Sequence, residues 1–244
     1  MKTALIIISY LCTQLSCNAQ ELPLDEIIYL GIDLTDKEHF EVFRSSFSTD
    51  IDVLGKDIME RADKARRYQA ELQVFLISDK GQANLVSLTH KEITSRETER
   101  QRRQIIAGFL IRVKRDIESM LHTLEVEDLP ATRIYEPLSH ITQNHPAGVP
   151  GVVIIWSDLL ENHKALSLYT KENMIDIARE ESKIKKDCYC DIGSLEGYKF
   201  YLVSYRICDN DRYVTRSLYW WCKLVESKGG FATAGSSLQS IFKT

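Results

Sequence analysis

Long apolar runs are scarce in this sequence. Outside residues 1–19, no stretch approaches the roughly 20 consecutive apolar residues that a membrane-spanning helix requires, so we expect no transmembrane segment. Internal repeats and low-complexity segments are absent as well. The 244 residues are 44% hydrophobic and 27% charged, which excludes the disordered, collagen-like and fibrous classes. A chain of this length and composition buries a large core in one or two globular domains.

Several catalytic motifs are also missing. The sequence contains no Gly-x-Ser-x-Gly, no glycine-rich phosphate-binding loop and no His-Glu-x-x-His. Its six histidines share no metal-ligand spacing, and only His140 and His145 lie near a predicted site loop. A nucleophile and its base therefore cannot be paired. The formal net charge of -4 at pH 7 is mildly acidic, which argues against general nucleic-acid binding.

Residues 1–19 have the layout of a secretory signal peptide: a lysine, an apolar run, then small and polar residues. Cleavage after Ala19 would leave Gln20 at the start of the mature chain. In the alternative, Cys17 is lipidated, although Gln14 stands where a lipidation motif usually has an aliphatic residue. We therefore expect a secreted or periplasmic bacterial protein or, in the alternative, a lipid-anchored protein of the cell envelope.

Two of the six cysteines lie in this leader, and four remain: Cys188, Cys190, Cys208 and Cys222. In an oxidising compartment, four cysteines predict two disulfides with three pairings to choose from. A direct Cys188–Cys190 bridge would be strained, so we expect each of these to pair with Cys208 or Cys222, or one to stay free. A zinc site is the alternative, but the two-residue spacer usual within a ligand pair is missing.

Apolar runs typical of strands alternate with helical patterns along the rest of the chain. This order predicts an α/β protein in which a mostly parallel central sheet lies between two helical layers, a three-layer α/β/α sandwich. A short "DKGQ" link between the second and third strands suits a hairpin, which predicts one antiparallel edge strand. We expect residues 20–244 to form a single domain. The predicted strands are Ile27–Ile32, Leu72–Ser78, Asn84–Leu88, Val152–Ser157, Phe200–Arg206 and Phe231–Ala234.

Helices are predicted where apolar residues recur with a period of 3.6. The strongest pattern lies between Ile93 and Leu124, and its polar face mixes bases with acids, which is typical of a solvated surface. A polar "STD" triplet at 48–50 predicts a break between two helices early in the chain. We expect Trp220 and Trp221 to pack in the interior rather than to anchor a partner. The predicted helices are 38–47, 53–68, one within 93–124, one starting after Thr132, 171–186 and 212–226.

Residues placed just after the predicted strands can form a site, because parallel strands bring their carboxyl ends to one edge of a sheet. Asp33, Thr35 and Lys37 follow the first strand, Asp158 follows "GVVIIWS", and Thr132 precedes the helix before that strand. Two carboxylates and two hydroxyls are the oxygen ligands that Mg²⁺ or Mn²⁺ prefers. The alternative is that these residues only cap turns and helices, where Asp and Thr are common.

This order of elements, with a strand ending in Asp-x-Thr and another ending in "VVIIWSD", resembles the von Willebrand factor A and integrin I-like domains. The resemblance covers nearly all of residues 25–243, through the pattern of elements and a few residues. It implies a metal-ion-dependent adhesion site, built in that family from Asp-x-Ser-x-Ser, a loop threonine and a further aspartate. Position by position, the residues that match are Asp33, Thr35, Thr132 and Asp158.

Lys37 departs from this pattern, because it stands where the family has its second serine. An ammonium group cannot be a metal ligand. If Lys37 folds inward, its charge replaces the metal beside Asp33 and Asp158, and we favour this metal-free arrangement. If Lys37 points to solvent, the four oxygen-bearing residues and water could still hold Mg²⁺ or Mn²⁺.

By this resemblance, we expect an exported, non-enzymatic module of the adhesion type that presents a degenerate metal site to a protein partner. In the family, the metal completes its shell with an acidic side chain of the partner. One alternative is a metal-dependent hydrolase that uses Asp33 and Asp158, for which His140 and His145 are the only nearby bases. Another is a structural subunit of a cell-envelope assembly. Fold alone does not decide between them.

Overall fold

The computed structural model describes residues 24–65, 67–79, 84–95, 98–124, 126, 132–162, 167–168, 176–205 and 211–242, with the side chains of 67 and 84–95 left out. The predicted leader and Cys208 lie outside these residues. Within the described part, no helix is both long enough and apolar enough to cross a membrane.

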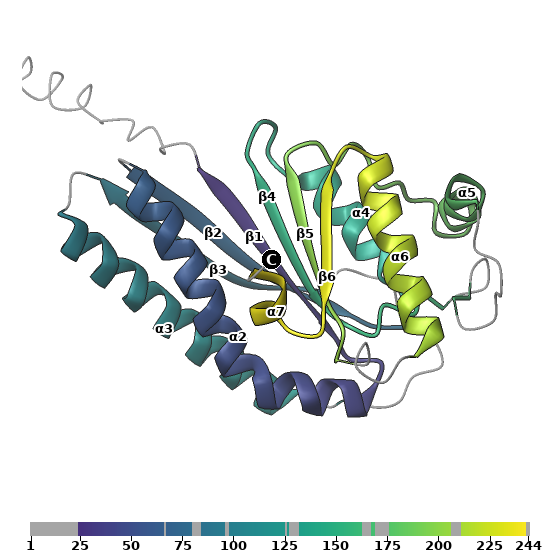
Figure 1. The fold of residues 1–244 in the computed structure, drawn as a ribbon, viewed down its shortest axis with the longest axis horizontal. Helices are drawn as coiled ribbons and strands as arrows, with labels where there is room; N and C mark the ends of the chain where they lie inside the picture. The colour runs from purple at the N-terminus through teal and green to yellow at the C-terminus, as the bar shows by residue number, and fades with distance from the viewer. Residues whose placement is uncertain are drawn as a thin grey trace, which may run out of the picture.

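A six-stranded sheet forms the centre of the molecule, with the order β3-β2-β1-β4-β5-β6 (Figure 1). The four pairings from β2 through β1, β4 and β5 to β6 are parallel, and β3 pairs antiparallel with β2 at one edge. The two central strands, β1 and β4, are buried along their whole length, which explains why they are continuous apolar runs. The strands are β1 (Glu26–Asp33), β2 (Arg67–Ile77), β3 (Asn84–Ser95), β4 (Gly151–Trp156), β5 (Tyr198–Val203) and β6 (Phe231–Gly235).

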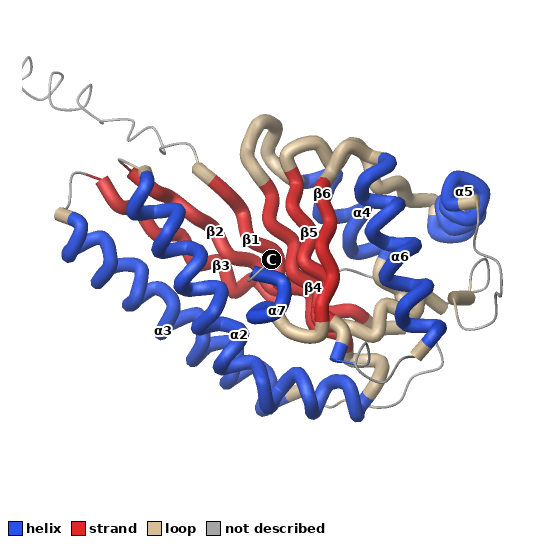
Figure 2. Tube along the Cα trace, viewed as in Figure 1, coloured by secondary structure: helices blue, strands red, loops and turns tan. Residues whose placement is uncertain are grey.

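Helices cover both faces of this sheet, so the α/β/α sandwich is confirmed (Figure 2). One core packs α2, α3 and α7 against the sheet, and the other packs α4, α5 and α6 against the opposite face. Alternate residues of β1 enter the two cores: Ile28 and Leu30 face α2, whereas Ile27 and Tyr29 face α4. The helices are α2 (Lys37–Lys64), α3 (Glu99–Thr123), α4 (Tyr135–Asn144), α5 (Ile177–Cys188), α6 (Arg212–Ser227) and α7 (Leu238–Phe242).

The predicted break at "STD" is wrong, because α2 runs unbroken from Lys37 to Lys64. Asp50, the last residue of that triplet, is buried and accepts hydrogen bonds from Trp156 Nε1 at 2.9 Å and from the Tyr205 hydroxyl at 3.0 Å. Trp156 and Tyr205 thus satisfy the polar side chain of Asp50 inside the protein, so the triplet does not need solvent and the helix continues through it. The expected burial of the tryptophan pair is confirmed, since Trp220 and Trp221 are each 1% exposed.

The strand order reverses between β1 and β4. From β1 the chain crosses through α2 to β2 on one side, and it later returns through α4 to place β4 on the other side of β1. The two crossing helices lie on opposite faces of the sheet. In open α/β sheets, ligands bind beyond the carboxyl ends of the strands at such a reversal. The loops that follow β1 and β4 are therefore where a site is expected.

Candidate functional site at the reversal of strand order

Three of the predicted site residues meet beyond β1. Asp33 is the last residue of this strand, Thr35 lies in the loop that follows it, and Thr132 precedes α4. A fourth residue, Ser157, joins them from the end of β4. We call these four residues the strand-end cluster. All are buried, and Asp33 is 2% exposed.

Two hydroxyl groups and one backbone N–H of the strand-end cluster donate to the Asp33 carboxylate. Asp33 Oδ1 accepts from the Thr35 backbone N–H at 2.8 Å and from the Thr35 hydroxyl at 2.6 Å, and its Oδ2 accepts from the Ser157 hydroxyl. The Thr35 and Thr132 hydroxyl oxygens lie 2.7 Å apart. Because Thr35 has a single hydroxyl proton and donates it to Asp33, Thr132 must be the donor in this second bond. The result is a chain of donors that ends on Asp33.

Two opposing effects act on the ionisation of Asp33. Burial raises its pKa above the ordinary value for aspartate, because the charged form loses its hydration. The hydrogen bonds from Ser157 and Thr35 lower the pKa, but less than burial raises it. Asp33 is thus a carboxyl group whose negative charge is stabilised by neutral donors.

The loop after β4, next to this cluster, makes tight turns that are closed by local hydrogen bonds. Its Asp158 accepts a hydrogen bond from the Leu160 N–H at 3.0 Å, and Ser157 accepts one from the Leu159 N–H at 2.8 Å. Leu159 has a φ of 60°, a conformation that costs free energy for a residue with a bulky side chain. The Leu159 carbonyl accepts from Trp221 Nε1 at 3.1 Å, so α6 holds the strained residue in place.

Glu161, in the same loop, is a buried capping residue that the sequence did not indicate. It is fully buried, and its Oε2 accepts from the backbone N–H groups of Ile134 at 2.8 Å and Tyr135 at 3.2 Å. It thereby caps α4, whose own N-cap residue, Ile134, makes no side-chain hydrogen bond. Burial raises the pKa of Glu161 to about 8 against the lowering effect of these two N–H groups. No local pattern announces such a cap, because the residues lie far apart in sequence.

Lys37 does not fold inward as the favoured metal-free arrangement required. It is the first residue of α2, directly after the N-cap Asp36, and its side chain is exposed. The groups that contact the Asp33 carboxylate are hydroxyls and a backbone N–H. Neutral donors therefore lie beside Asp33, where the metal-free arrangement predicts the ammonium group of Lys37.

The Asp33 carboxylate is held by hydrogen bonds without a cation. Carboxylate, hydroxyl and serine oxygens are the right ligand chemistry for Mg²⁺. However, Asp33 Oδ1 already accepts two hydrogen bonds and Oδ2 accepts one, so a cation would have to compete with these donors for the carboxylate. Throughout the described residues, no group of three or more His, Cys, Asp or Glu side chains is arranged to hold a metal ion.

The two histidines considered as bases lie away from the cluster. His140 is exposed on α4, and His145 follows the C-terminal end of that helix, whereas Thr132 precedes its N-terminal end. His145 pairs with the Tyr29 hydroxyl at 2.9 Å and with the Val149 carbonyl at 2.7 Å. These contacts place His145 toward the start of β4, at the opposite end of the strands from Asp33. It therefore does not serve the strand-end cluster as a base.

The predicted disulfide pairing is wrong. Cys188 and Cys190 are bridged to each other, with their Cα atoms 5.2 Å apart, and Cys222 is a free thiol. Between the two cysteines, Tyr189 ends α5 in the left-handed conformation, with φ 52° and ψ 35°. Cys208 lies outside the described residues.

No protein-family model and no curated protein sequence matches this chain. Solved structures that resemble it include the N-terminal domain of TFIIH p34, which is 9% identical with a TM-score of 0.40, over 89% of this chain and 94% of that one. Proximal thread matrix protein 1 from the mussel byssus is 12% identical with a TM-score of 0.34, over 89% of this chain and 45% of that one. The parallel sheet between two helical layers is compatible with a von Willebrand factor A-like fold.

Proposed function

We propose that this chain is an exported, non-enzymatic protein-binding module of the von Willebrand factor A type whose metal site is degenerate. The partner contacts the face beyond the strand ends. What supports this proposal is the position of the strand-end cluster at the reversal of strand order, together with the residue pattern Asp33, Thr35, Thr132 and Asp158.

The observation that carries the proposal is the closed state of Asp33. Each of its oxygens accepts at least one hydrogen bond from a buried neutral donor, so a cation or a substrate would have to compete with these donors for the carboxylate. A module with such a site recognises its partner without a bridging cation. Lys37, exposed at the first residue of α2, then contributes a positive charge to the face that meets the partner.

Capture of the partner from an extract of the source cells tests this proposal when two matched variants are compared. Lys37→Glu reverses the charge at the first residue of α2, and Lys64→Glu reverses it at the exposed last residue of the same helix. A glutamate in the first helical turn is favourable, so Lys37→Glu is expected to fold.

The natural chain and Lys64→Glu are expected to retain the same protein with Mg²⁺ and with EDTA, while Lys37→Glu binds it about tenfold more weakly. Retention that requires Mg²⁺ would show that a cation bridges the partner after all. Equal retention by both variants, or no retained protein, would place the binding face elsewhere or refute a binding role.

A further inference from the structure

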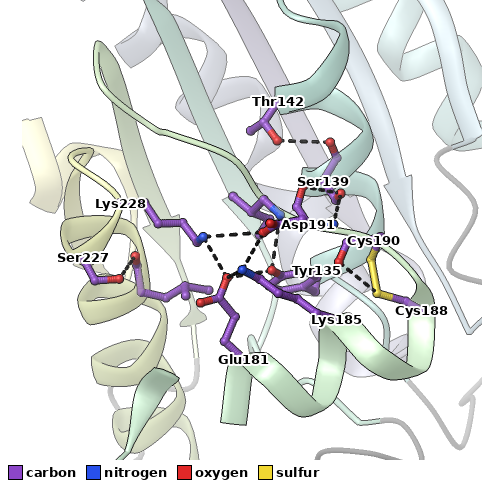
Figure 3. Close-up of polar contacts among 12 residues, drawn as sticks. Tyr135, Ser139, Thr142, Glu181, Lys185, Cys188, Cys190, Asp191, Ser227 and Lys228 are labelled. Atoms are coloured by element: carbon purple, nitrogen blue, oxygen red, sulfur yellow. Dashed lines mark hydrogen bonds and ion pairs between the residues drawn. A yellow bond between two sulfur atoms is a disulfide. The ribbon is translucent and has the colours of Figure 1, made fainter. Parts of the chain in front are cut away.

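The Cys188–Cys190 bridge belongs to no part of the strand-end cluster. It closes over a single residue, Tyr189, whose side chain is 95% exposed. Both cysteines, whose bridge is drawn in Figure 3, are half-buried at the end of α5, so solvent reaches part of this segment. An accessible bridge of this kind calls for a reason other than burial in a core.

Stabilisation of the fold is a weak reason for this bridge. A disulfide stabilises mainly by restricting the unfolded chain, and the effect grows with the length of the closed loop. The two cysteines here are separated by only two positions in sequence. The bridge therefore removes little conformational freedom that the unfolded chain would otherwise have.

Non-covalent contacts already hold the residues that follow the bridge. The Asp191 N–H donates to the Ser139 hydroxyl at 3.0 Å, and this hydroxyl donates to the Asp191 carbonyl at 2.8 Å. The Asp191 carboxylate pairs with Lys185 at 2.7 Å, and the Ile192 N–H donates to the Tyr135 hydroxyl at 3.2 Å (Figure 3). Because these contacts come from α4 and α5, opening the bridge would leave the two sulfur atoms close to each other.

Tyr189, between the two bridged cysteines, has an unfavourable backbone conformation. Residues other than Gly and Asn seldom adopt a positive φ, because their side chains clash with the backbone. Tyr189 nevertheless has a positive φ. Reduction allows Tyr189 to leave this conformation, which favours the dithiol over the disulfide. Exposed and strained disulfides are the ones that undergo exchange.

We propose that Cys188 and Cys190 form a thiol–disulfide exchange site that accepts two electrons from a dithiol. A thiolate of the dithiol attacks one cysteine sulfur, the Cys188–Cys190 bond breaks, and the other sulfur leaves as a thiolate that takes up a proton. The second thiol of the reagent then attacks the mixed disulfide. The dithiol ends as a disulfide, and the protein ends with two thiols.

Differential alkylation of the full chain with dithiothreitol as the probe tests this proposal. Tryptic cleavage after Lys186 and Lys199 releases both cysteines in one peptide, "DCYCDIGSLEGYK". Under native conditions we expect this peptide to become doubly alkylated, with unchanged circular dichroism, and to close again when oxidised dithiothreitol is added. A bridge that resists reduction until denaturant unfolds the chain, or reduction that abolishes the circular dichroism signal, would overturn the proposal.

Two variants at Tyr189 separate exchange driven by strain from simple exposure. Tyr189→Asn leaves both cysteines in place, and asparagine tolerates the positive φ. Its ratio of reduced to bridged peptide at a fixed redox ratio should therefore fall about fivefold. Tyr189→Val tolerates this conformation less well, so its ratio should rise. Identical ratios in all three proteins would contradict the role given to Tyr189.

Discussion

At the scale of single residues, the chain buries Asp33 and Asp50 and satisfies both with neutral donors. Asp33 receives hydroxyl and backbone protons, and Asp50 receives protons from Trp156 and Tyr205. Burial raises the pKa of both aspartates, and these donors lower it. A buried carboxylate without such donors is costly, so each donor is important for stability.

The Ser157 hydroxyl is expected to stabilise the fold through Asp33. Ser157→Ala should lower the free energy of unfolding by about 1–3 kcal/mol, because it leaves one oxygen of a buried carboxylate without its donor. Urea unfolding measures the change. Ser45→Ala, on the exposed face of α2, is the matched control and should change stability by less than about 0.5 kcal/mol. Equal effects of both substitutions would show that the Asp33–Ser157 bond contributes nothing.

Asp50 ties the middle of α2 to the sheet and to α7. Asp50→Ala should cost about 3 kcal/mol, because it leaves the buried Trp156 N–H and the Tyr205 hydroxyl without their acceptor. Asp50→Asn retains one acceptor oxygen and should cost less. Thermal unfolding of both variants checks the order, and a larger loss in the asparagine variant would contradict this interpretation.

At the scale of elements, α4 depends on a carboxyl group from another loop. Glu161 accepts from the first backbone N–H groups of this helix, and the same helix is preceded by Thr132 of the strand-end cluster. The loop after β4 therefore fixes both the start of α4 and the position of Asp33. Its left-handed Leu159 is held by Trp221, so the buried tryptophan pair also supports the site.

Glu161 should make stability depend on pH. Its pKa is raised from 4.5 to about 8 in the folded chain, so the fold favours the neutral form. This contribution is fully present below about pH 4.5 and is lost as the pH rises toward about 8, on the order of 5 kcal/mol. Glu161→Gln keeps an acceptor for the cap and removes the titration. Urea unfolding between about pH 5 and 8 should show a shallower fall for the variant, and parallel curves would contradict the assignment.

Local patterns predicted the elements whose burial is regular. The strands at 27–32 and 152–157 were evident because they are apolar on both faces, and α6 was evident from its period. The break in α2 was wrong because Asp50 finds its partners in β4 and beyond β5, which a local polar triplet does not reveal. The disulfide pairing was wrong because a left-handed Tyr189 cannot be read from the letters "CYC".

The site was predictable to the extent that topology determines it. Strand ends converge in a parallel sheet, so the meeting of Asp33, Thr35 and Thr132 followed from their positions. Ser157 directly precedes Asp158, the residue predicted for the site. Nothing in the sequence distinguishes which of these two side chains turns toward Asp33. Glu161 was missed because a cap on a helix earlier in the chain leaves no local signal.

At the scale of the whole molecule, two cores share the central strands and the site lies where the strand order reverses. Asp33 ends β1 and Ser157 follows β4, and these two strands separate the cores, which explains why both residues are buried. The charge available to a partner on this face comes from residues such as Lys37, outside the cluster. The exchange site at the end of α5 belongs to the opposite helical layer from α2, so the two proposals can be tested independently.

The central claim is that Asp33 is satisfied by hydroxyl groups in place of a cation. Calorimetric titration of the natural chain with Mg²⁺ and Mn²⁺ tests it most directly, with Asp33→Asn and Lys37→Ser as comparisons. We predict no saturable heat for any of the three proteins, because a cation would have to compete with the donors that already bind each oxygen of Asp33. Saturable binding by the natural chain that Asp33→Asn abolishes, or binding gained by Lys37→Ser, would contradict the claim.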